Sequence, residues 1–343
     1  MSRVCVQDYV DAAREQVSPE VWCYFEGGAG DEVTLRANVA AYAHWRFRPR
    51  MLVDVSEIRL ETTLLGTPVS MPLGIAPFAM QRLLDPEGEA ATARAAARAG
   101  ALMVVSSLTS RRHADIAAAS DGPRWLQLYV LRDRQQTLDH IAEAKQAGYG
   151  AIVLTVDMPY VGRRERDLRL GFEPVADLPY AHLFHTTPAL TWRDLEWVRS
   201  ETGLPLVLKG ILTREDALLA VEHGADAVWV SNHGGRQLDH VAAGLDALPE
   251  VVDAVGGRGE VYVDGGVRRG GDVLKALALG ARAAFAGRAF ACGLAVGGEA
   301  GVAQVLSLLR DELELGLGLL GCASPEQVTR GHVERAVPYD PVA

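Results

Sequence analysis

The segment Ser231–Asp239, Ser-Asn-His-Gly-Gly-Arg-Gln-Leu-Asp, places an imidazole, two glycines and a guanidinium within a few positions. It follows an apolar run typical of a β-strand, so His233 and Arg236 lie just past a strand end. Histidine titrates near neutrality and can accept a proton, and the arginine fork suits a carboxylate. The glycines permit positive φ. The alternative is a surface turn at the start of a helix, so the other strand ends must decide.

A repeat begins at residue 73, in which an apolar run, a polar loop and an Ala/Leu-rich helical stretch alternate eight times. Strands that are apolar throughout are typical of a parallel sheet covered on both faces. Eight such units predict a single α/β domain folded as a (β/α)8 TIM barrel. A doubly wound sheet is the alternative, but no G-x-G-x-x-G follows the first strand. The expected strands are Leu73–Ala76, Leu102–Ser106, Trp125–Tyr129, Ala151–Val156, Leu206–Lys209, Ala227–Ser231, Glu260–Val263 and Ala283–Ala286.

The rest of the chain is expected to flank this barrel. We predict one domain over 1–343, with an N-terminal helical preamble at 1–72, the barrel at 73–297, and a closing helix with a tail at 298–343. The segment Pro159–Leu190 after the fourth strand is too long for an ordinary loop, so we expect a lid.

Composition limits the partners and the compartment. A formal net charge of −10 argues against nucleic acid or an anionic membrane surface as partner. Because we find no basic-then-apolar segment at the N-terminus and no long uncharged apolar run, we expect neither a signal peptide nor a membrane span. The four cysteines have no metal-ligand spacing and fit a reducing compartment. We therefore expect a cytoplasmic protein with no metal in its site.

Nearly every expected strand ends on a polar, titratable or glycine residue. Active sites of TIM barrels are built at these carboxyl ends, so we predict one shared site. Asp264-Gly-Gly-Val-Arg268 and Gly287-Arg288 follow the last two strands, where barrels commonly hold a phosphate. Arg236 and the Arg163-Arg164 pair suggest a second anion site, suited to a substrate carboxylate.

Several of these motifs together resemble a known family. They are Tyr24-Phe-Glu-Gly-Gly-Ala, Ala76-Pro-Phe-Ala-Met80, Gln127-Leu-Tyr129, Leu154-Thr-Val-Asp157, Leu208-Lys-Gly210 and Ser231–Asp239. Over nearly its whole length the chain resembles the FMN-dependent 2-hydroxy-acid oxidases and dehydrogenases. This group includes glycolate oxidase, lactate oxidase, mandelate dehydrogenase and the flavin domain of flavocytochrome b2.

The resemblance implies roles for individual residues. His233 is expected to be the base, oriented by Asp157, while the C2 hydrogen and its electrons pass to flavin N5 by a hydride or a carbanion route. The substrate is expected to be bound by Tyr129, Tyr24, Arg236 and Arg164. The residues expected to hold FMN are Pro77, Phe78, Ala79, Ser106, Gln127, Thr155, Lys209, Ser231, Asp264, Gly266, Arg268, Gly287 and Arg288.

Departures from the family bear on the substrate and the acceptor. Plant glycolate oxidases have a tryptophan where this chain has Leu108, which favours (S)-2-hydroxy acids larger than glycolate, such as lactate, longer aliphatic acids or mandelate-like acids. The side chains that could line such a pocket are Phe25, Phe78, Met80, Met158 and Tyr160.

The resemblance also bears on the electron acceptor and the assembly. Ala79 beside the expected N5 position favours O2 as acceptor, and the family suggests a homotetramer or octamer. The alternatives are a dehydrogenase with a quinone or protein acceptor, another FMN or phosphate-binding barrel, and a flavin-binding protein without turnover.

Overall fold

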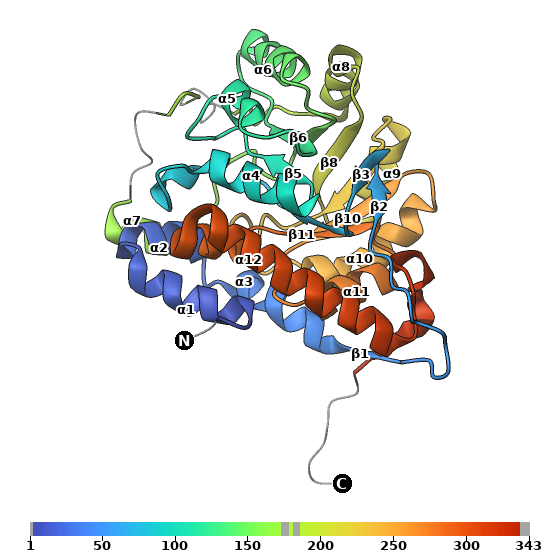
Figure 1. The fold of residues 1–343 in the computed structure, drawn as a ribbon. Coiled ribbons are helices and arrows are strands. Elements are labelled where there is room, and N and C mark those ends of the chain that lie inside the picture. Colours follow the sequence, from blue (N-terminus) through green and yellow to red (C-terminus); the bar gives the residue numbers. More distant parts are fainter. Residues whose placement is uncertain (1–2, 173–177, 181–185, 337–343) are drawn as a thin grey trace.

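The centre of the molecule is a closed barrel of eight parallel strands. A computed structural model describes residues 3–172, 178–180 and 186–336. The barrel order is β10-β11-β4-β5-β6-β7-β8-β9, so each strand pairs with its neighbours in sequence and β11 closes onto β4 (Figure 1). The predicted TIM barrel is confirmed. The strands are β4 (Leu73–Ile75), β5 (Met103–Val105), β6 (Arg124–Leu128), β7 (Ile152–Thr155), β8 (Leu206–Ile211), β9 (Ala227–Val230), β10 (Glu260–Asp264) and β11 (Ala283–Ala286).

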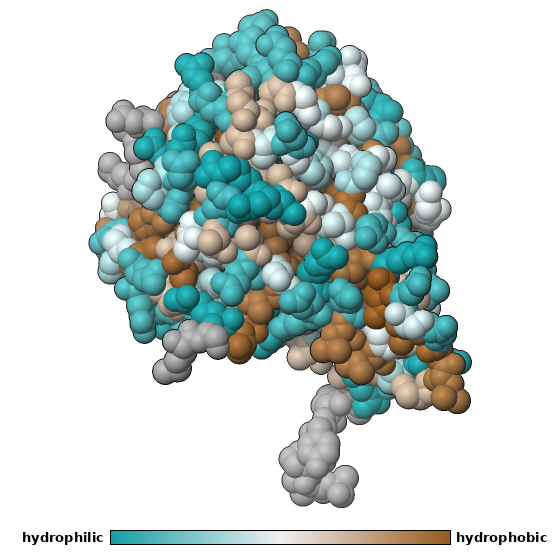
Figure 2. Space-filling model, viewed as in Figure 1, coloured by the Kyte–Doolittle hydropathy of each residue, from teal (hydrophilic) through white to brown (hydrophobic). Residues whose placement is uncertain are grey.

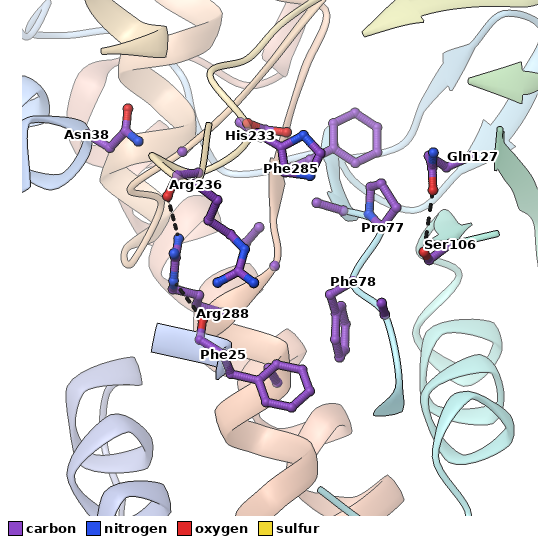
Figure 3. Close-up of a pocket in the computed structure, with 18 of the residues that line it drawn as sticks. Phe25, Asn38, Pro77, Phe78, Ser106, Gln127, His233, Arg236, Phe285 and Arg288 are labelled. Atoms are coloured by element: carbon purple, nitrogen blue, oxygen red, sulfur yellow. Dashed lines mark hydrogen bonds between the residues drawn. The ribbon is translucent and has the colours of Figure 1, made fainter. Parts of the chain in front are cut away.

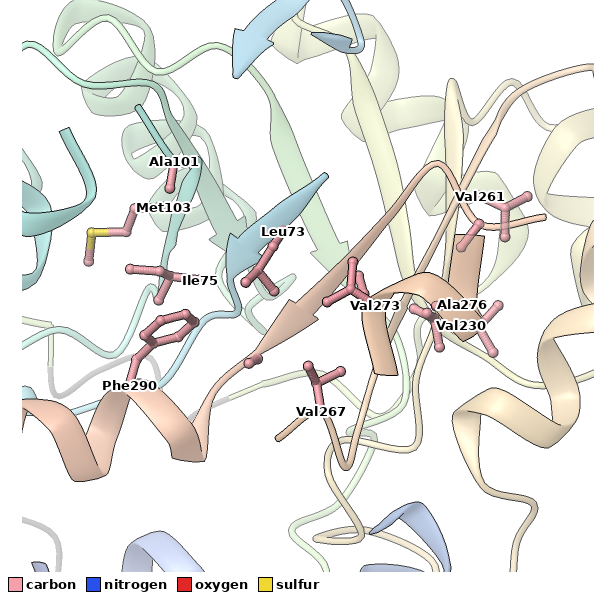
Figure 4. Packing of buried hydrophobic residues seen from close by; sticks show 14 of the residues in the cluster. Leu73, Ile75, Ala101, Met103, Val230, Val261, Val267, Val273, Ala276 and Phe290 are labelled. Carbon is pink, nitrogen blue, oxygen red and sulfur yellow. The ribbon is translucent and has the colours of Figure 1, made fainter. Parts of the chain in front are cut away.

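Alternate residues of the barrel strands form two apolar layers, as the two-residue period of a strand requires. The inner layer contains Trp125, Trp229, Tyr262 and Phe285, and the Trp229 and Phe285 rings lie 4.0 Å apart. The outer layer packs against the helices, and Figure 4 shows part of it. The strands are apolar throughout because both of their faces are covered.

Helices surround the barrel, and along the chain they alternate with its strands. They are α1 (Val6–Gln16), α2 (Pro19–Glu26), α3 (Val33–Ala40), α4 (Glu89–Ala99), α5 (His113–Ala118), α6 (Arg134–Gln146), α7 (Glu165–Leu170), α8 (Trp192–Thr202), α9 (Arg214–Glu222), α10 (Gly244–Val255), α11 (Gly270–Ala278) and α12 (Arg288–Leu320). Short antiparallel pairs join β1 (Trp45–Phe47) to β12 (Val333–Arg335) and β2 (Thr62–Leu64) to β3 (Thr67–Val69).

The last helix closes the structure. α12 lies against α1, α4 and α11, and it bends at Gly297 and Gly298, whose backbone is not helical (Figure 1). By length and composition α12 could cross a membrane, but its apolar residues Val302, Leu309, Leu313 and others are buried in the outer layer of the barrel. We therefore assign α12 to the core. The division at 72/73 and at 297/298 into preamble, barrel and tail stays a prediction.

The predicted lid falls partly outside the described residues. Of 159–190, the structure describes 159–172, 178–180 and 186–190, and it includes α7. Residues 173–177 and 181–185 lie outside the described part. Phe172 stacks on Tyr24 of α2, with 4.8 Å between the ring centroids, so the described part of this segment reaches the preamble.

Candidate active site

A cavity of about 290 Å³ lies at the carboxyl ends of the barrel strands. Figure 3 shows Gln127 and Ser106 on one side of it and Arg236 and Arg288 on the other. The predicted residues on its wall are Tyr24, Pro77, Phe78, Ala79, Ser106, Gln127, Tyr129, Thr155, Arg164, Lys209, His233, Arg236, Asp264, Gly266, Arg268, Gly287 and Arg288. The structure therefore brings together nearly all of the residues singled out from the sequence.

The two predicted residues that lie off the wall support their neighbours. Asp157 lies beside His233, with 2.9 Å between Asp157 Oδ1 and His233 Nδ1. Ser231 is fully buried, and its hydroxyl oxygen accepts hydrogen bonds from Lys209 Nζ (2.8 Å) and the His233 backbone N–H (3.0 Å). The hydroxyl of Ser231 is directed at these protein groups, and its predicted role in binding the cofactor stays a prediction.

The turn that carries His233 needs unusual backbone angles. His233, Gly234 and Gly235 all have positive φ, at 59°, 65° and 75°. A Cβ on Gly235 would lie 2.7 Å from the backbone of Leu35 in α3, so only glycine fits there. A non-glycine residue with positive φ is uncommon, and such strain is often kept at functional sites. Here it points the His233 ring into the cavity.

The Asp157 carboxylate is built to stay ionised. Burial acts to raise its pKa, but the charge and hydrogen bond of His233 and the charge of Lys209 outweigh burial and lower it. A carboxylate on Nδ1 requires the proton of a neutral His233 to sit on Nδ1, which leaves Nε2 as the acceptor. His233 can therefore take a proton at Nε2.

Three arginines, Arg164, Arg236 and Arg288, line the cavity, and we call this part of it the arginine-rich end. Figure 3 shows Arg236 and Arg288 on the side opposite Gln127 and Ser106. Arg236 Nη1 donates to the carbonyls of Tyr24 (2.5 Å) and Gly27 (2.9 Å), and Arg164 Nε donates to the Arg236 carbonyl (3.4 Å). Burial and, after it, the charge of Arg164 together lower the pKa of Arg236 to about 9. Burial also lowers the pKa of Arg288. This end therefore has positive charge that an anionic ligand would neutralise.

Two tyrosines stand near these charges. Burial and the charge of Asp157 raise the pKa of Tyr129 far above its usual range, so its hydroxyl remains a hydrogen-bond donor. The Arg236 guanidinium lies 5.0 Å from the ring centroid of Tyr24. Both tyrosines line the cavity, as predicted.

Between these groups the wall offers polar atoms that fit a flavin ring. Gln127 Nε2 and Thr155 Oγ1 are buried and have no hydrogen-bond partner among the described residues. Lys209 is a buried residue, 4% exposed, and its Nζ lies 3.1 Å from Asp264 Oδ2. Buried donors without partners are costly, so a ligand with carbonyl and ring nitrogen acceptors would satisfy them.

The far end of the cavity fits a phosphate. Gly287 precedes α12, whose first-turn N–H groups can bind an anion, and Gly266 has a φ of 82°. Arg268 also lines this end. Arg288 lines this end too, and its guanidinium donates to the carbonyls of Phe25, Gly27 and Gly234. Three of its five N–H groups are used in this way, so its contact with the phosphate stays a prediction. Arg288 therefore holds these loops together and contributes charge.

The apolar part of the wall agrees only in part with the sequence. Leu108, Phe25, Phe78 and Met158 line the cavity as predicted, whereas Met80 is buried away from it and Tyr160 is 75% exposed. The prediction was wrong for these last two because Met80, with a φ of 53°, turns into the core, and Tyr160 lies on the surface.

Helix α3 of the preamble contributes residues to the cavity that were not predicted from the sequence. Asn38 of α3 lines the cavity and exchanges two side-chain hydrogen bonds with Asn232, at 2.8 and 2.9 Å. Leu35 and Val39 of the same helix also line it. Their spacing on one helix face was the available signal, but nothing in the sequence indicated that this face meets the barrel.

Comparison with known proteins agrees with this geometry. The family model described as FMN-dependent dehydrogenase matches residues 13–335. The chain is 47% identical to an L-lactate oxidase of Nostoc sp. over 94% of this chain and 95% of that protein, and 45% identical to 2-hydroxyacid oxidase 2 of Bos taurus over 97% and 99%. Its structure matches mandelate oxidase bound to benzoyl-formic acid, with a TM-score of 0.94, 45% identity, and coverage of 98% and 100%. The chain belongs to the FMN-dependent dehydrogenase family.

Proposed function

We propose that this protein is an FMN-dependent oxidase of (S)-2-hydroxy acids, forming the 2-oxo acid. The observation that carries the proposal is one cavity that contains a base with a free Nε2, an arginine-rich end and buried donors that fit a flavin. Bound FMN would accept the C2 hydrogen and its two electrons. The protein binds the acid, orients it and moves the proton.

His233 removes the proton of the substrate hydroxyl. Its Nε2 accepts the proton of the substrate hydroxyl, and the Asp157 carboxylate 2.9 Å from Nδ1 stabilises the imidazolium that forms. Tyr129 donates a hydrogen bond to the substrate oxygen, since its raised pKa keeps the phenol protonated.

The arginine-rich end of the cavity orients the substrate. Arg236 and Arg164 pair with the substrate carboxylate, which neutralises buried positive charge and fixes the acid in one orientation. Tyr24 lies beside Arg236 and donates a further hydrogen bond to the carboxylate.

The cofactor is held along the rest of the wall. Gln127, Thr155 and Lys209 face the ring, and Lys209 offers a fixed positive charge to a reduced, anionic flavin. Gly266, Gly287 and Arg268 hold the phosphate end.

An apolar wall favours substrates larger than glycolate. Leu108, Phe78, Phe25 and Met158 lie on the cavity with the arginine-rich end, so an aliphatic or aromatic side chain has apolar surface to bury. Lactate, longer aliphatic 2-hydroxy acids and mandelate-like acids meet this description, and solved mandelate oxidase structures share the fold at 44–45% identity.

We further propose O2 as the acceptor, a homotetramer and a cytoplasmic location. The relatives named as oxidases support O2. An exposed apolar group of Met51, Leu52, Val53, Leu315 and Leu319 supports assembly, and brown surface gathers at the lower right of Figure 2, where α12 ends. The four free cysteines support a reducing compartment.

The experiment is anaerobic mixing of the purified flavoprotein with a panel of 2-hydroxy acids, followed by air. Bleaching at 450 nm by an acid, with fast recolouring and peroxide, supports an oxidase and identifies its substrates. Bleaching with slow recolouring means a dehydrogenase with a quinone or protein acceptor. Flavin that no 2-hydroxy acid bleaches contradicts the proposed reaction.

A further inference from the structure

A buried cluster away from the flavin cavity contains two histidines and a glutamate. His113 begins α5, and His140 and Glu143 lie one turn apart on α6, so they share a face of that helix. Each residue offers one nitrogen or carboxylate oxygen, and these three atoms lie within 4.8 Å of one another. None of the three residues lines the active-site cavity.

The His113 side chain is poorly satisfied for a buried polar group. It is 0% exposed, and neither ring nitrogen has a hydrogen-bond partner among the described residues. Glu143 Oε2 lies 3.7 Å from Nδ1, beyond normal hydrogen-bond length. A buried imidazole that has this long contact with a carboxylate, and no hydrogen bond on either ring nitrogen among the described residues, calls for a ligand.

Glu143 directs one carboxylate oxygen towards His113, with 3.7 Å between Oε2 and His113 Nδ1. The Tyr180 hydroxyl donates to Oε1 at 2.6 Å, so Oε2 faces His113. A carboxylate oriented by an outer hydrogen bond is the usual arrangement around a metal ligand.

We propose that His113, His140 and Glu143 bind one divalent transition-metal ion, for which zinc is best suited. Imidazole nitrogens and a carboxylate oxygen are preferred zinc ligands, and hard ions such as Mg²⁺ and Ca²⁺ prefer all-oxygen sites. Zinc ligand atoms lie about 3.4 Å apart, so the three side chains need to move by only about 1 Å. The ion would coordinate one ring nitrogen of His113, which has no hydrogen bond among the described residues.

The site lies beside a wall of the active site. The Tyr180 ring stacks on the His113 ring, with 4.4 Å between centroids, and its hydroxyl accepts from the His113 backbone N–H at 3.0 Å. Tyr180 also belongs to an apolar cluster with Leu108 and Tyr129, which line the flavin cavity. The ion therefore fixes α5, α6 and Tyr180 behind the part of the wall that receives the substrate side chain.

The test is the metal content of the untagged, FMN-loaded enzyme, since a histidine tag would bind zinc itself. After growth with zinc and gel filtration, elemental analysis is expected to find close to one zinc per chain. The variants His140→Ala and Glu143→Gln lose a ligand and are expected to bind at least about 100-fold more weakly. Two variants are used so that one misfolding does not decide the outcome.

The control is His223→Ala, which removes another histidine–glutamate pair, with 2.7 Å between His223 Nδ1 and Glu196 Oε1 near the surface. It is expected to keep the zinc. A second measurement adds Co²⁺ to chelator-treated enzyme: a visible absorption band beyond 500 nm and a raised melting temperature are expected in the wild type and His223→Ala only.

Zinc-free wild type whose melting temperature neither ion raises would overturn the site, and the cluster would then be a buried histidine–glutamate ion pair. Equal binding in the wild type and both ligand variants would overturn it as well, since the metal would sit elsewhere. Neither result depends on whether the enzyme oxidises 2-hydroxy acids.

Discussion

His233 Nδ1 lies 2.9 Å from Asp157 Oδ1, although the two residues follow different strands of the barrel, β9 and β7. The pairing is fixed from both sides. Gly210 in β8 leaves room for it, because a Cβ there would lie 2.7 Å from the Asp157 Cβ. The Ser231 hydroxyl accepts a hydrogen bond from the backbone N–H of His233. The base is thus oriented before any substrate enters.

Replacing Asp157 by asparagine is expected to leave FMN bound and to slow flavin reduction by about 100-fold or more, because the imidazolium loses its counter-charge. Stopped-flow bleaching at saturating substrate measures this. Reduction at the wild-type rate would mean that Asp157 does not support the base.

The same substitution predicts a pH dependence of stability. The pKa of Asp157 is lowered in the folded protein, so its carboxylate stabilises the fold above the unfolded value near 3.8, and this contribution is lost as pH falls through the folded value. The free energy of unfolding of wild type and Asp157→Asn, measured in denaturant across the acid range, should therefore converge below pH 3.8. A gap that stays constant with pH would contradict the ionised state.

Arg236→Met is expected to raise KM for every 2-hydroxy acid by roughly 10–100-fold, the cost of losing a charged hydrogen bond to the carboxylate. Arg163→Met is the matched control, because Arg163 is exposed and off the cavity wall. Steady-state kinetics of both variants decide it. An equal, small change in both would remove Arg236 from the carboxylate site.

Leu108→Trp is expected to narrow the cavity. Leu108 is 8% exposed and lines the wall, so a larger ring should reduce kcat/KM for mandelate-like acids by roughly 10–100-fold and spare glycolate. The ratio of kcat/KM values for the two acids is the measurement. If that ratio does not change, the substrate side chain lies elsewhere.

Gly266→Ala is expected to weaken FMN retention and stability. At a φ of 82° an alanine costs about 1–3 kcal/mol, and its Cβ would lie 2.0 Å from the Asn38 carbonyl oxygen, which would push α3 off the barrel. Gly257→Ala separates the two causes, because Gly257 has a φ of 77° and nothing within 4 Å of the added Cβ. Gly266→Ala should lose clearly more melting temperature and flavin content than Gly257→Ala. Equal losses in the two variants would show that the contact with Asn38 does not matter.

The barrel could be predicted because its signals are local. A strand buried on both faces reads as an apolar run, and glycines with positive φ, such as Gly100, Gly148, Gly224 and Gly280, end its helices. Since parallel barrel strands end at one face, the residues after them could be expected to meet. This is why His233, Arg236 and Lys209 were found together in the structure.

The rest depends on contacts between distant segments, which a single sequence does not reveal. Three features depend on tertiary contacts of this kind. Asn38 is hydrogen-bonded to Asn232, Met80 is buried in the core, and the Arg288 guanidinium donates to three backbone carbonyls. The cluster of His113, His140 and Glu143 could not be predicted for the same reason, since its members lie on two helices and their sequence spacing is not that of a metal-binding motif.

The central claim is that His233 removes the substrate proton in this cavity. The most direct measurement is the anaerobic rate of flavin bleaching at 450 nm in His233→Ala, prepared with FMN bound and mixed with the best acid from the panel. We predict normal flavin content and a reduction rate lower by about 100-fold to 10,000-fold. Bleaching at the wild-type rate in a fully flavin-loaded variant would contradict the account.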